Sequence, residues 1–173
     1  KKLIPKVDTW FVGLGISRHL EKWGVSAKAI AEFDWWNNIE FEGIQITYTP
    51  SRHFSGRGAF DRAKSLWGGW VFKTPDYSVY WSGDGGYGPH FKEIGEKLGP
   101  FDFGFIECGQ YNENWHAIHM YPEESVQAAI DAAFIQNKRD VGCTVVFSSS
   151  ELIVSHKPGF GLRSISSELD LYQ

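Results

Sequence analysis

The sequence has few cysteines and no long apolar run. Only Cys108 and Cys143 occur in 173 residues, which argues against a scaffold of several disulfides and against a zinc ribbon. A transmembrane helix needs about 18 or more consecutive apolar residues, and no such run exists. Residues 1–6 are too few and too polar for a signal peptide. We therefore expect a cytoplasmic protein without a membrane-spanning segment.

An excess of positive charge is also missing. The 17 Lys and Arg residues are outnumbered by 21 Asp and Glu residues, and the formal net charge is -4. A general nucleic-acid binder needs a basic face that replaces the counterions of the phosphates, so nucleic acid is not an expected partner. The hydrophobic share of 42% and the charged share of 22% are those of an ordinary globular chain. The length fits one domain or a large part of one.

Aromatic residues are abundant. The chain contains 8 Trp, 7 Tyr and 13 Phe residues, which make up 16% of the sequence. This much ring surface builds a hydrophobic core, or it lines a pocket for an apolar ligand. Composition alone leaves both interpretations open.

Alternating or apolar runs predict strands, and cap and stop residues predict helices. Pro122 at a first helical position and Gly99-Pro100 at a helix end are the clearest signals. Residues 27–35 are ambiguous, and 59–67 have a moderate helical pattern. The order of elements favours a layered domain of mixed α/β or α+β type over an all-helical bundle. The expected strands are 7–13, 43–49, 69–73, 78–82, 101–107 and 144–147, and the expected helices are 18–23 capped by Ser17, 89–98 and 122–134.

The first candidate site residue is His53. It follows the alternating strand 43–49, where the chain leaves the sheet, and a neutral imidazole in that position is a common metal ligand. Arg52 and Arg57 flank it and are expected to hold an anionic substrate group. The alternative is a solvated loop histidine that ligates nothing.

The second candidate is Asp84, in the glycine-rich turn 83–88 that follows the strand 78–82. Its carboxylate is a hard ligand that can bridge two divalent ions. The alternative is an ordinary Asp-Gly turn. A phosphate-binding P-loop is disfavoured because no Lys-Ser or Lys-Thr pair follows the glycines.

Two histidines, His116 and His119, precede the predicted helix at Pro122 and can supply a ligand and a general acid or base. The alternative is that one packs on Trp115 and the other caps the helix. Glu107, at the end of an apolar strand, is a further carboxylate that is either functional or structural.

Five motifs together resemble one branch of the metallo-β-lactamase superfamily. The branch is the one that contains the N-acyl-phosphatidylethanolamine-hydrolysing phospholipase D. The motifs occur in the same order as in that branch, which makes a chance match improbable. They are 32–36 (EFDWW), 49–57 (TPSRHFSGR), 65–70 (SLWGGW), 80–87 (YWSGDGGY) and 119–124 (HMYPEE).

The resemblance implies an αββα sandwich with zinc at one edge of its paired sheets. It implies a metal-dependent hydrolase that uses a zinc-bound hydroxide on a phosphodiester or another small or lipid-like substrate. Position by position, His53 matches a metal ligand and Asp84 matches the aspartate that bridges two metals. His119 matches a histidine near substrate and metals. His53, Asp84 and His119 are thus the expected metal ligands, and Asp84 and His119 the expected catalytic residues.

The family pattern is incomplete in this sequence. The His-x-His-x-Asp-His motif and the final His-Trp-Gly setting are both absent. We therefore expect residues 1–133 to be the C-terminal half of the family domain, and residues 134–173 to be a divergent tail. The complete domain would hold two zinc ions, and this chain one or none. Whether the chain is an enzyme stays open: the alternatives are an inactive fragment and an aromatic-rich binding module. An uncovered sheet face would favour self-association.

Overall fold

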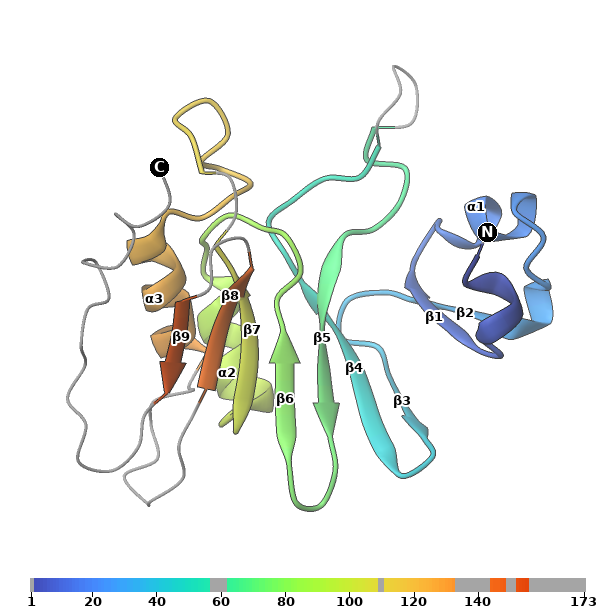
Figure 1. Ribbon diagram of the computed structural model, residues 1–173, viewed down its shortest axis with the longest axis horizontal. Helices are drawn as coiled ribbons and strands as arrows, with labels where there is room; N and C mark the ends of the chain where they lie inside the picture. Colours follow the sequence, from blue (N-terminus) through green and yellow to red (C-terminus); the bar gives the residue numbers. More distant parts are fainter. Residues whose placement is uncertain (1, 57–61, 109–110, 133–143, 149–151, 156–173) are drawn as a thin grey trace.

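The computed structural model describes residues 2–56, 62–108, 111–132, 144–148 and 152–155 (Figure 1). Its strands form a seven-stranded sheet in the order β3-β4-β5-β6-β7-β8-β9 and a two-stranded sheet of β1 and β2. The strands are β1 Trp10–Gly13, β2 Ile30–Phe33, β3 Asn38–Phe41, β4 Ile44–Pro50, β5 Gly68–Lys73, β6 Ser78–Trp81, β7 Phe103–Glu107, β8 Thr144–Ser148 and β9 Leu152–Ser155. The α-helices are α1 Ser17–Lys22, α2 His90–Leu98 and α3 Pro122–Asp131, and the 3-10 helices are η1 Ile4–Lys6 and η2 Ala27–Ala29.

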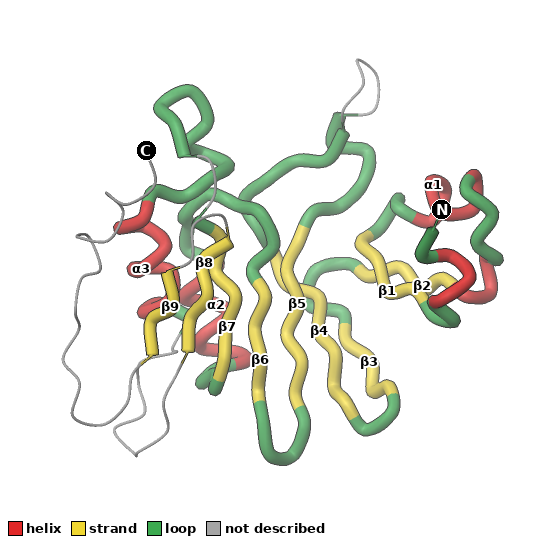
Figure 2. The backbone as a smooth tube through the Cα atoms, viewed as in Figure 1, coloured by secondary structure: helices red, strands yellow, loops and turns green. Residues whose placement is uncertain are grey.

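The large sheet is mixed. Strands β3 to β6 pair antiparallel, with a long loop between β4 and β5, whereas β6, β7 and β8 pair parallel and β8 pairs antiparallel with β9. A parallel pair needs a crossover connection. Helix α2 lies in the crossover from β6 to β7, and α3 in the one from β7 to β8. Both helices therefore lie on one face of the sheet, as Figure 2 shows.

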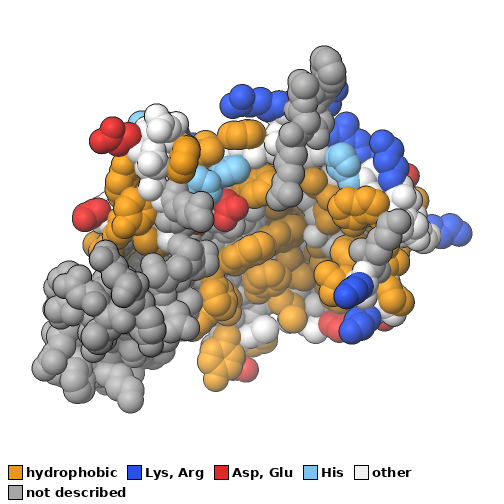
Figure 3. Space-filling view, turned by 45° about the horizontal axis from the view of Figure 1, so that its top comes forward, with side chains coloured by type: hydrophobic (Ala, Val, Ile, Leu, Met, Phe, Trp, Pro, Cys, Tyr) orange, Lys and Arg blue, Asp and Glu red, His pale blue; other side chains and the backbone are white. Residues whose placement is uncertain are grey.

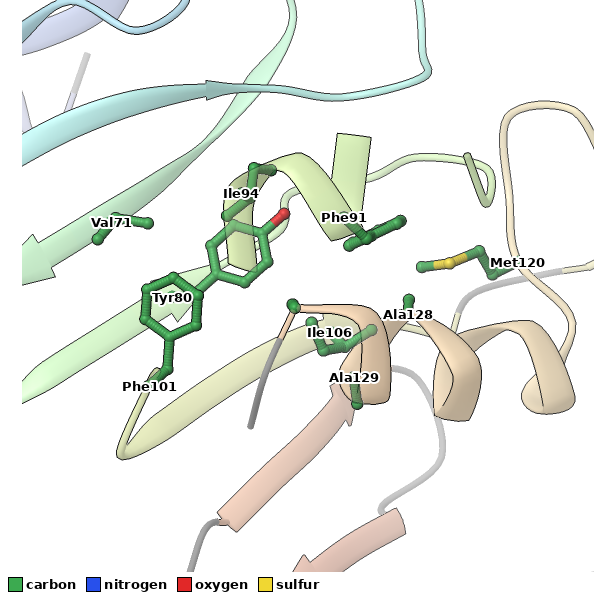
Figure 4. Close-up of a cluster of buried hydrophobic side chains, with 10 residues drawn as sticks. Val71, Tyr80, Phe91, Ile94, Phe101, Ile106, Met120, Ala128 and Ala129 are labelled. Carbon is green, nitrogen blue, oxygen red and sulfur yellow. The ribbon is translucent and has the colours of Figure 1, made fainter. Parts of the chain in front are cut away.

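The main core lies between this sheet face and the two helices (Figure 4). Phe91 and Ile94, three residues apart on α2, are almost fully buried, and the Phe91 ring lies 6.4 Å from the ring of Tyr80 on β6. Gly95, one residue further, lies so close to α3 that a side-chain carbon there would be 2.5 Å from the Asp131 carbonyl oxygen. The spacing of apolar residues on α2 thus fixes how both helices pack.

The opposite sheet face carries rows of aromatic side chains. The register aligns Tyr48, Trp70, Trp81 and Phe105 across four strands, so all four point the same way. The small sheet covers one end of this row, because the Phe33 and Trp70 rings are 5.3 Å apart. The other end stays uncovered: Trp81 is 49% exposed and Phe105 42% exposed. Figure 3 shows hydrophobic side chains collected on this side of the molecule.

The expected α+β architecture is confirmed in its partial form: a helix layer, one large sheet and a two-stranded sheet are described. The predicted helices near 18–23 and 89–98, the start of the one at 122 and the six predicted strands are present, with shifts of up to three residues at their ends, and residues 133–134 lie outside the described residues. The ambiguous segment 27–35 resolves into η2 followed by β2, and β3 and β9 were not predicted. Strands β8 and β9 lie in the segment expected to diverge, and β8 pairs with β7.

Two local predictions were wrong. Residues 62–67 form turns and irregular structure rather than a helix. The Ser55 hydroxyl accepts a hydrogen bond from the Ser65 amide and donates one to the Ser65 carbonyl oxygen, which takes both groups away from a helical pattern. Residues 59–61 lie outside the described residues. Ser17 does not cap α1: it is the first helical residue after Ile16, and its amide donates to Glu32 Oε1 at 2.8 Å.

Candidate functional site

Three loops meet at one edge of the large sheet. Because β5 runs antiparallel to both β4 and β6, and β7 runs parallel to β6, strands β4, β6 and β7 all point in the same direction. Their carboxyl ends therefore lie at the same edge. His53 follows β4, Asp84 follows β6, and His119 lies in the connection after β7.

The loop of Asp84 is fixed through its main chain. The Asp84 carbonyl oxygen accepts a hydrogen bond from Ser51 Oγ at 2.7 Å and another from Trp67 Nε1 at 2.9 Å. An isolated β-bridge joins Arg52 to Gly86 alongside these bonds. The Asp84 side chain is exposed. The loops of His53 and Asp84 are thus held side by side, with the carboxylate open to solvent.

The His53 ring is held on two sides. It stacks on Trp67, with ring centroids 4.7 Å apart, and its Nδ1 lies 2.7 Å from the Phe54 carbonyl oxygen. A carbonyl oxygen only accepts hydrogen bonds, so Nδ1 carries the proton and Nε2 is the basic nitrogen. A histidine that ligates a metal is oriented in this way by the bond of its other nitrogen.

His119 is held in the same manner by a carboxylate. Its Nδ1 lies 2.8 Å from Glu107 Oε1, and Glu107 is only 3% exposed. The rings of His119 and His53 are 5.3 Å apart between centroids and lie edge to face. Figure 3 shows histidine side chains beside an acidic one at this edge. The fold therefore brings two oriented imidazoles together from segments 66 positions apart.

The glycine-rich loop approaches the His119 segment closely. A side-chain carbon at Gly86 would be 2.1 Å from the Ala117 carbonyl oxygen and 3.0 Å from the Ile118 nitrogen. Only a residue without a side chain fits there without displacing backbone. This contact, which no motif in the sequence indicates, keeps the loop of Asp84 beside the segment of His119.

Arg52 lies against the glycine-rich loop, and its expected role in holding an anionic group stays a prediction. Its Nη1 donates to the Tyr87 carbonyl oxygen at 2.9 Å, and its side chain lines a hollow of about 380 Å³ with Trp35, Trp36 and His90. Burial and the neighbouring guanidinium lower the pKa of His90 to about 4, so this imidazole is neutral. Arg57 lies outside the described residues, and His116 is exposed.

A catalytic zinc ion takes three protein ligands and a water. Within the described ranges, no group of three or more His, Cys, Asp or Glu side chains is gathered as a metal site. The two imidazoles fit a metal as part of a ligand set, since each is anchored through Nδ1 to an oxygen. The ligand roles of His53, Asp84 and His119 stay predictions.

The sequence comparisons define the family. A model described as a beta-lactamase superfamily domain matches residues 2–138. The chain therefore belongs to the metallo-β-lactamase superfamily. Within it, the chain is similar to the branch of the N-acyl-phosphatidylethanolamine-hydrolysing phospholipases D, as the relative from Caenorhabditis elegans indicates. That protein, named N-acyl-phosphatidylethanolamine-hydrolyzing phospholipase D 1, is 35% identical over 135 residues, which are 72% of this chain and 38% of the relative.

Two bacterial relatives extend the comparison. An uncharacterized protein of Mycobacterium tuberculosis is 41% identical over 122 residues, which are 70% of this chain and 32% of the relative. The outer membrane protein RomA of Klebsiella pneumoniae is 54% identical over 88 residues, which are 51% of this chain and 66% of the relative. The chain thus spans about a third of the mycobacterial and nematode relatives and about two thirds of RomA.

The solved structures show the same fold. A metallo hydrolase from the archaeon Ignicoccus hospitalis, named Igni18, superposes with a TM-score of 0.57 at 18% identity. The match covers 80% of this chain and 52% of the archaeal one. At this identity the similarity shows the fold alone. In the part of the chain that the structure describes, no helix has the length and apolarity to cross a membrane.

Proposed function

We propose that this chain carries part of a zinc-dependent hydrolase site that acts on phosphodiesters. The observation that carries the proposal is the pair of imidazoles, 5.3 Å apart and each anchored through Nδ1 to an oxygen. This arrangement leaves two basic nitrogens at the sheet edge where the loop of Asp84 also lies.

Each residue has a proposed role. His53 and Asp84 bind the metal, and His119 either completes the ligand set or moves a proton at the reacting centre. The bound zinc would supply a water whose pKa is lowered to about 7, and hence a hydroxide at neutral pH. The His119 Nε2 is the atom that accepts the proton or coordinates. The stacking of His53 on Trp67 excludes water from one face of that ring.

The substrate class follows from the relatives. The nematode relative is named for hydrolysis of N-acyl-phosphatidylethanolamine, a phosphodiester lipid. We propose that the substrate of this chain is likewise a phosphodiester with an apolar part. The matched residues are only 38% of that relative. The proposal therefore includes further metal ligands beyond His53, Asp84 and His119.

The proposal is tested by zinc analysis and a phosphodiesterase assay on the purified chain. We expect zinc in the wild type, and a loss of at least about 100-fold in zinc affinity and activity in His53→Ala and in Asp84→Ala, because both substitutions remove ligands. Matched controls are His19→Ala in α1 and Asp76→Ala in the turn between β5 and β6, which are expected to keep both properties. Zinc-free wild type, with activity unchanged in both site variants, would contradict the proposal.

The uncovered aromatic face supports a second proposal, that copies of the chain associate through it. Two large side chains there, Trp81 and Phe105, are 49% and 42% exposed, and burying such surface is favourable. We expect the wild type to elute in size-exclusion chromatography above its mass of 19.6 kDa, increasingly with concentration. The double variant Trp81→Ser, Phe105→Ser is expected to elute as a monomer.

The control for that experiment is Tyr77→Ser, which removes a ring that is 69% exposed at the turn between β5 and β6. It is expected to elute like the wild type. A wild-type monomer at all concentrations would exclude this association. Sedimentation with lipid vesicles distinguishes self-association from lipid binding by the same face, because only lipid binding would carry the chain down with the vesicles.

The cytoplasmic location stays a prediction, and one relative is named an outer membrane protein.

A further inference from the structure

Glu107 is a buried carboxylate to which the proposed function assigns no role of its own. It is the last residue of β7 and is 3% exposed. A carboxylate is costly to bury unless hydrogen-bond donors surround it. Both of its oxygens have a partner from the segment that carries His119. Oε1 lies 2.8 Å from His119 Nδ1, and Oε2 accepts the Met120 amide at 3.0 Å.

The two partners of the Glu107 carboxylate differ in whether they can change between donating and accepting a hydrogen bond. The Met120 amide can only donate, so it requires an acceptor oxygen. An imidazole nitrogen either donates or accepts, and it follows whatever its partner offers. Next to a carboxylate that already accepts one hydrogen bond, Nδ1 is the donor. The lone pair of the neutral ring then lies on Nε2.

The main chain of Glu107 is also held on both sides, because its amide donates to Ser82 Oγ at 3.0 Å. Ser125 Oγ, in α3, donates to the Glu107 main-chain carbonyl oxygen at 2.7 Å. Glu107 therefore connects the end of β7, the segment of His119 and the first turns of α3. Since its two oxygens bond to consecutive residues, they fix both the main chain at Met120 and the rotation of the His119 ring.

We propose that Glu107 is the positioning residue of His119. Glu107 keeps the proton of the neutral ring on Nδ1, so that Nε2 carries the lone pair that binds a metal or accepts a proton. That Nε2 works in hydrolysis rests on the proposed function. The position of the proton does not, because it follows from the hydrogen bonds alone.

The proposal predicts a tautomer switch in Glu107→Gln. The Met120 amide still needs an oxygen, so the glutamine carbonyl faces it. The amide NH₂ then faces His119 Nδ1, and because NH₂ only donates, Nδ1 has to accept. The proton therefore moves to Nε2. A purely structural glutamate would tolerate this nearly isosteric change without moving the proton.

The test is ¹⁵N NMR of the histidine side chains in the full chain, without metal and at alkaline pH. His119→Gln serves to assign the signals. In the wild type we expect His119 to show a protonated Nδ1 and an unprotonated Nε2, and in Glu107→Gln the reverse. Glu113→Gln makes the same chemical change at an exposed residue of the same connection and is expected to keep the wild-type pattern.

An unprotonated Nδ1 in the wild type would overturn the proposal, as would an unchanged pattern in a folded Glu107→Gln. If that variant fails to fold, the wild-type spectrum alone still decides. Zinc titration is a second readout, with a 10- to 100-fold weaker affinity expected for Glu107→Gln. A wild type with the expected tautomer but no zinc binding would reject the proposed function and leave the positioning role intact.

Discussion

Replacing Gly86 by alanine is expected to separate the glycine-rich loop from the segment of His119. The added carbon would be 2.1 Å from the Ala117 carbonyl oxygen, and backbone cannot yield as a flexible side chain would. We expect a loss of about 3 kcal/mol of stability, at the upper end for overpacking. For a chain of this size that lowers the melting temperature by about 6–12 °C. Zinc binding should fall with it, because Asp84 and His119 move apart.

Gly43→Ala is the matched control. Gly43 lies in the turn between β3 and β4 with a φ of +79°, and an added side-chain carbon there meets nothing within 4 Å. The substitution strains the backbone by about 1 kcal/mol without a clash. We expect a small decrease in melting temperature and unchanged zinc content. Gly86→Ala behaving like this control in both measurements would show that the contact with Ala117 does not hold the site together.

The largest effect on stability is expected from Phe91→Ala. Phe91 is 1% exposed and lies between α2 and the sheet, at the centre of the core in Figure 4. Truncating it leaves a cavity that its rigid neighbours cannot fill, and such changes cost about 3–5 kcal/mol. The free energy of unfolding, measured by urea denaturation, should fall by that amount.

Phe105→Ala makes the same change on the other sheet face. Phe105 is 42% exposed and contacts Phe103, with ring centroids 4.9 Å apart. Because much of the ring already meets solvent, we expect a loss below about half that of Phe91→Ala. Equal losses for the two variants would mean that the uncovered face is covered in solution. Both variants should therefore be compared at the same low protein concentration.

Much of the fold could be predicted from local signals. The alternation of residues 43–49 predicted β4, and the Gly99-Pro100 stop predicted the end of α2. Residues 62–67 could not be predicted, since a hydrogen bond from Ser55 outweighs a weak helical pattern there. Strand β3 is short and mostly exposed, so it lacks an apolar pattern and exists through its pairing with β4.

The site was predictable in its residues but not in its contacts. His53, Asp84 and His119 stand in motifs that resemble one family, and each follows a strand that local pattern reveals. Ser51 and Trp67 stand in the same motifs, but the motifs do not indicate that both bind the Asp84 carbonyl oxygen. Glu107 allows a functional and a structural interpretation equally, because its bond to His119 exists only in the folded chain.

By itself, the sequence determined the α+β class, most of the strands and helices, and the family. These depend on apolar spacing, cap residues and motif order, which are properties of neighbouring positions. Only the tertiary structure decided that two imidazoles from distant segments lie 5.3 Å apart, and which oxygens orient them. It also decided which aromatic residues form the core and which lie on an open face. Those facts depend on which strands pair and in which direction, and that is decided when segments distant in the sequence come together to bury one sheet face.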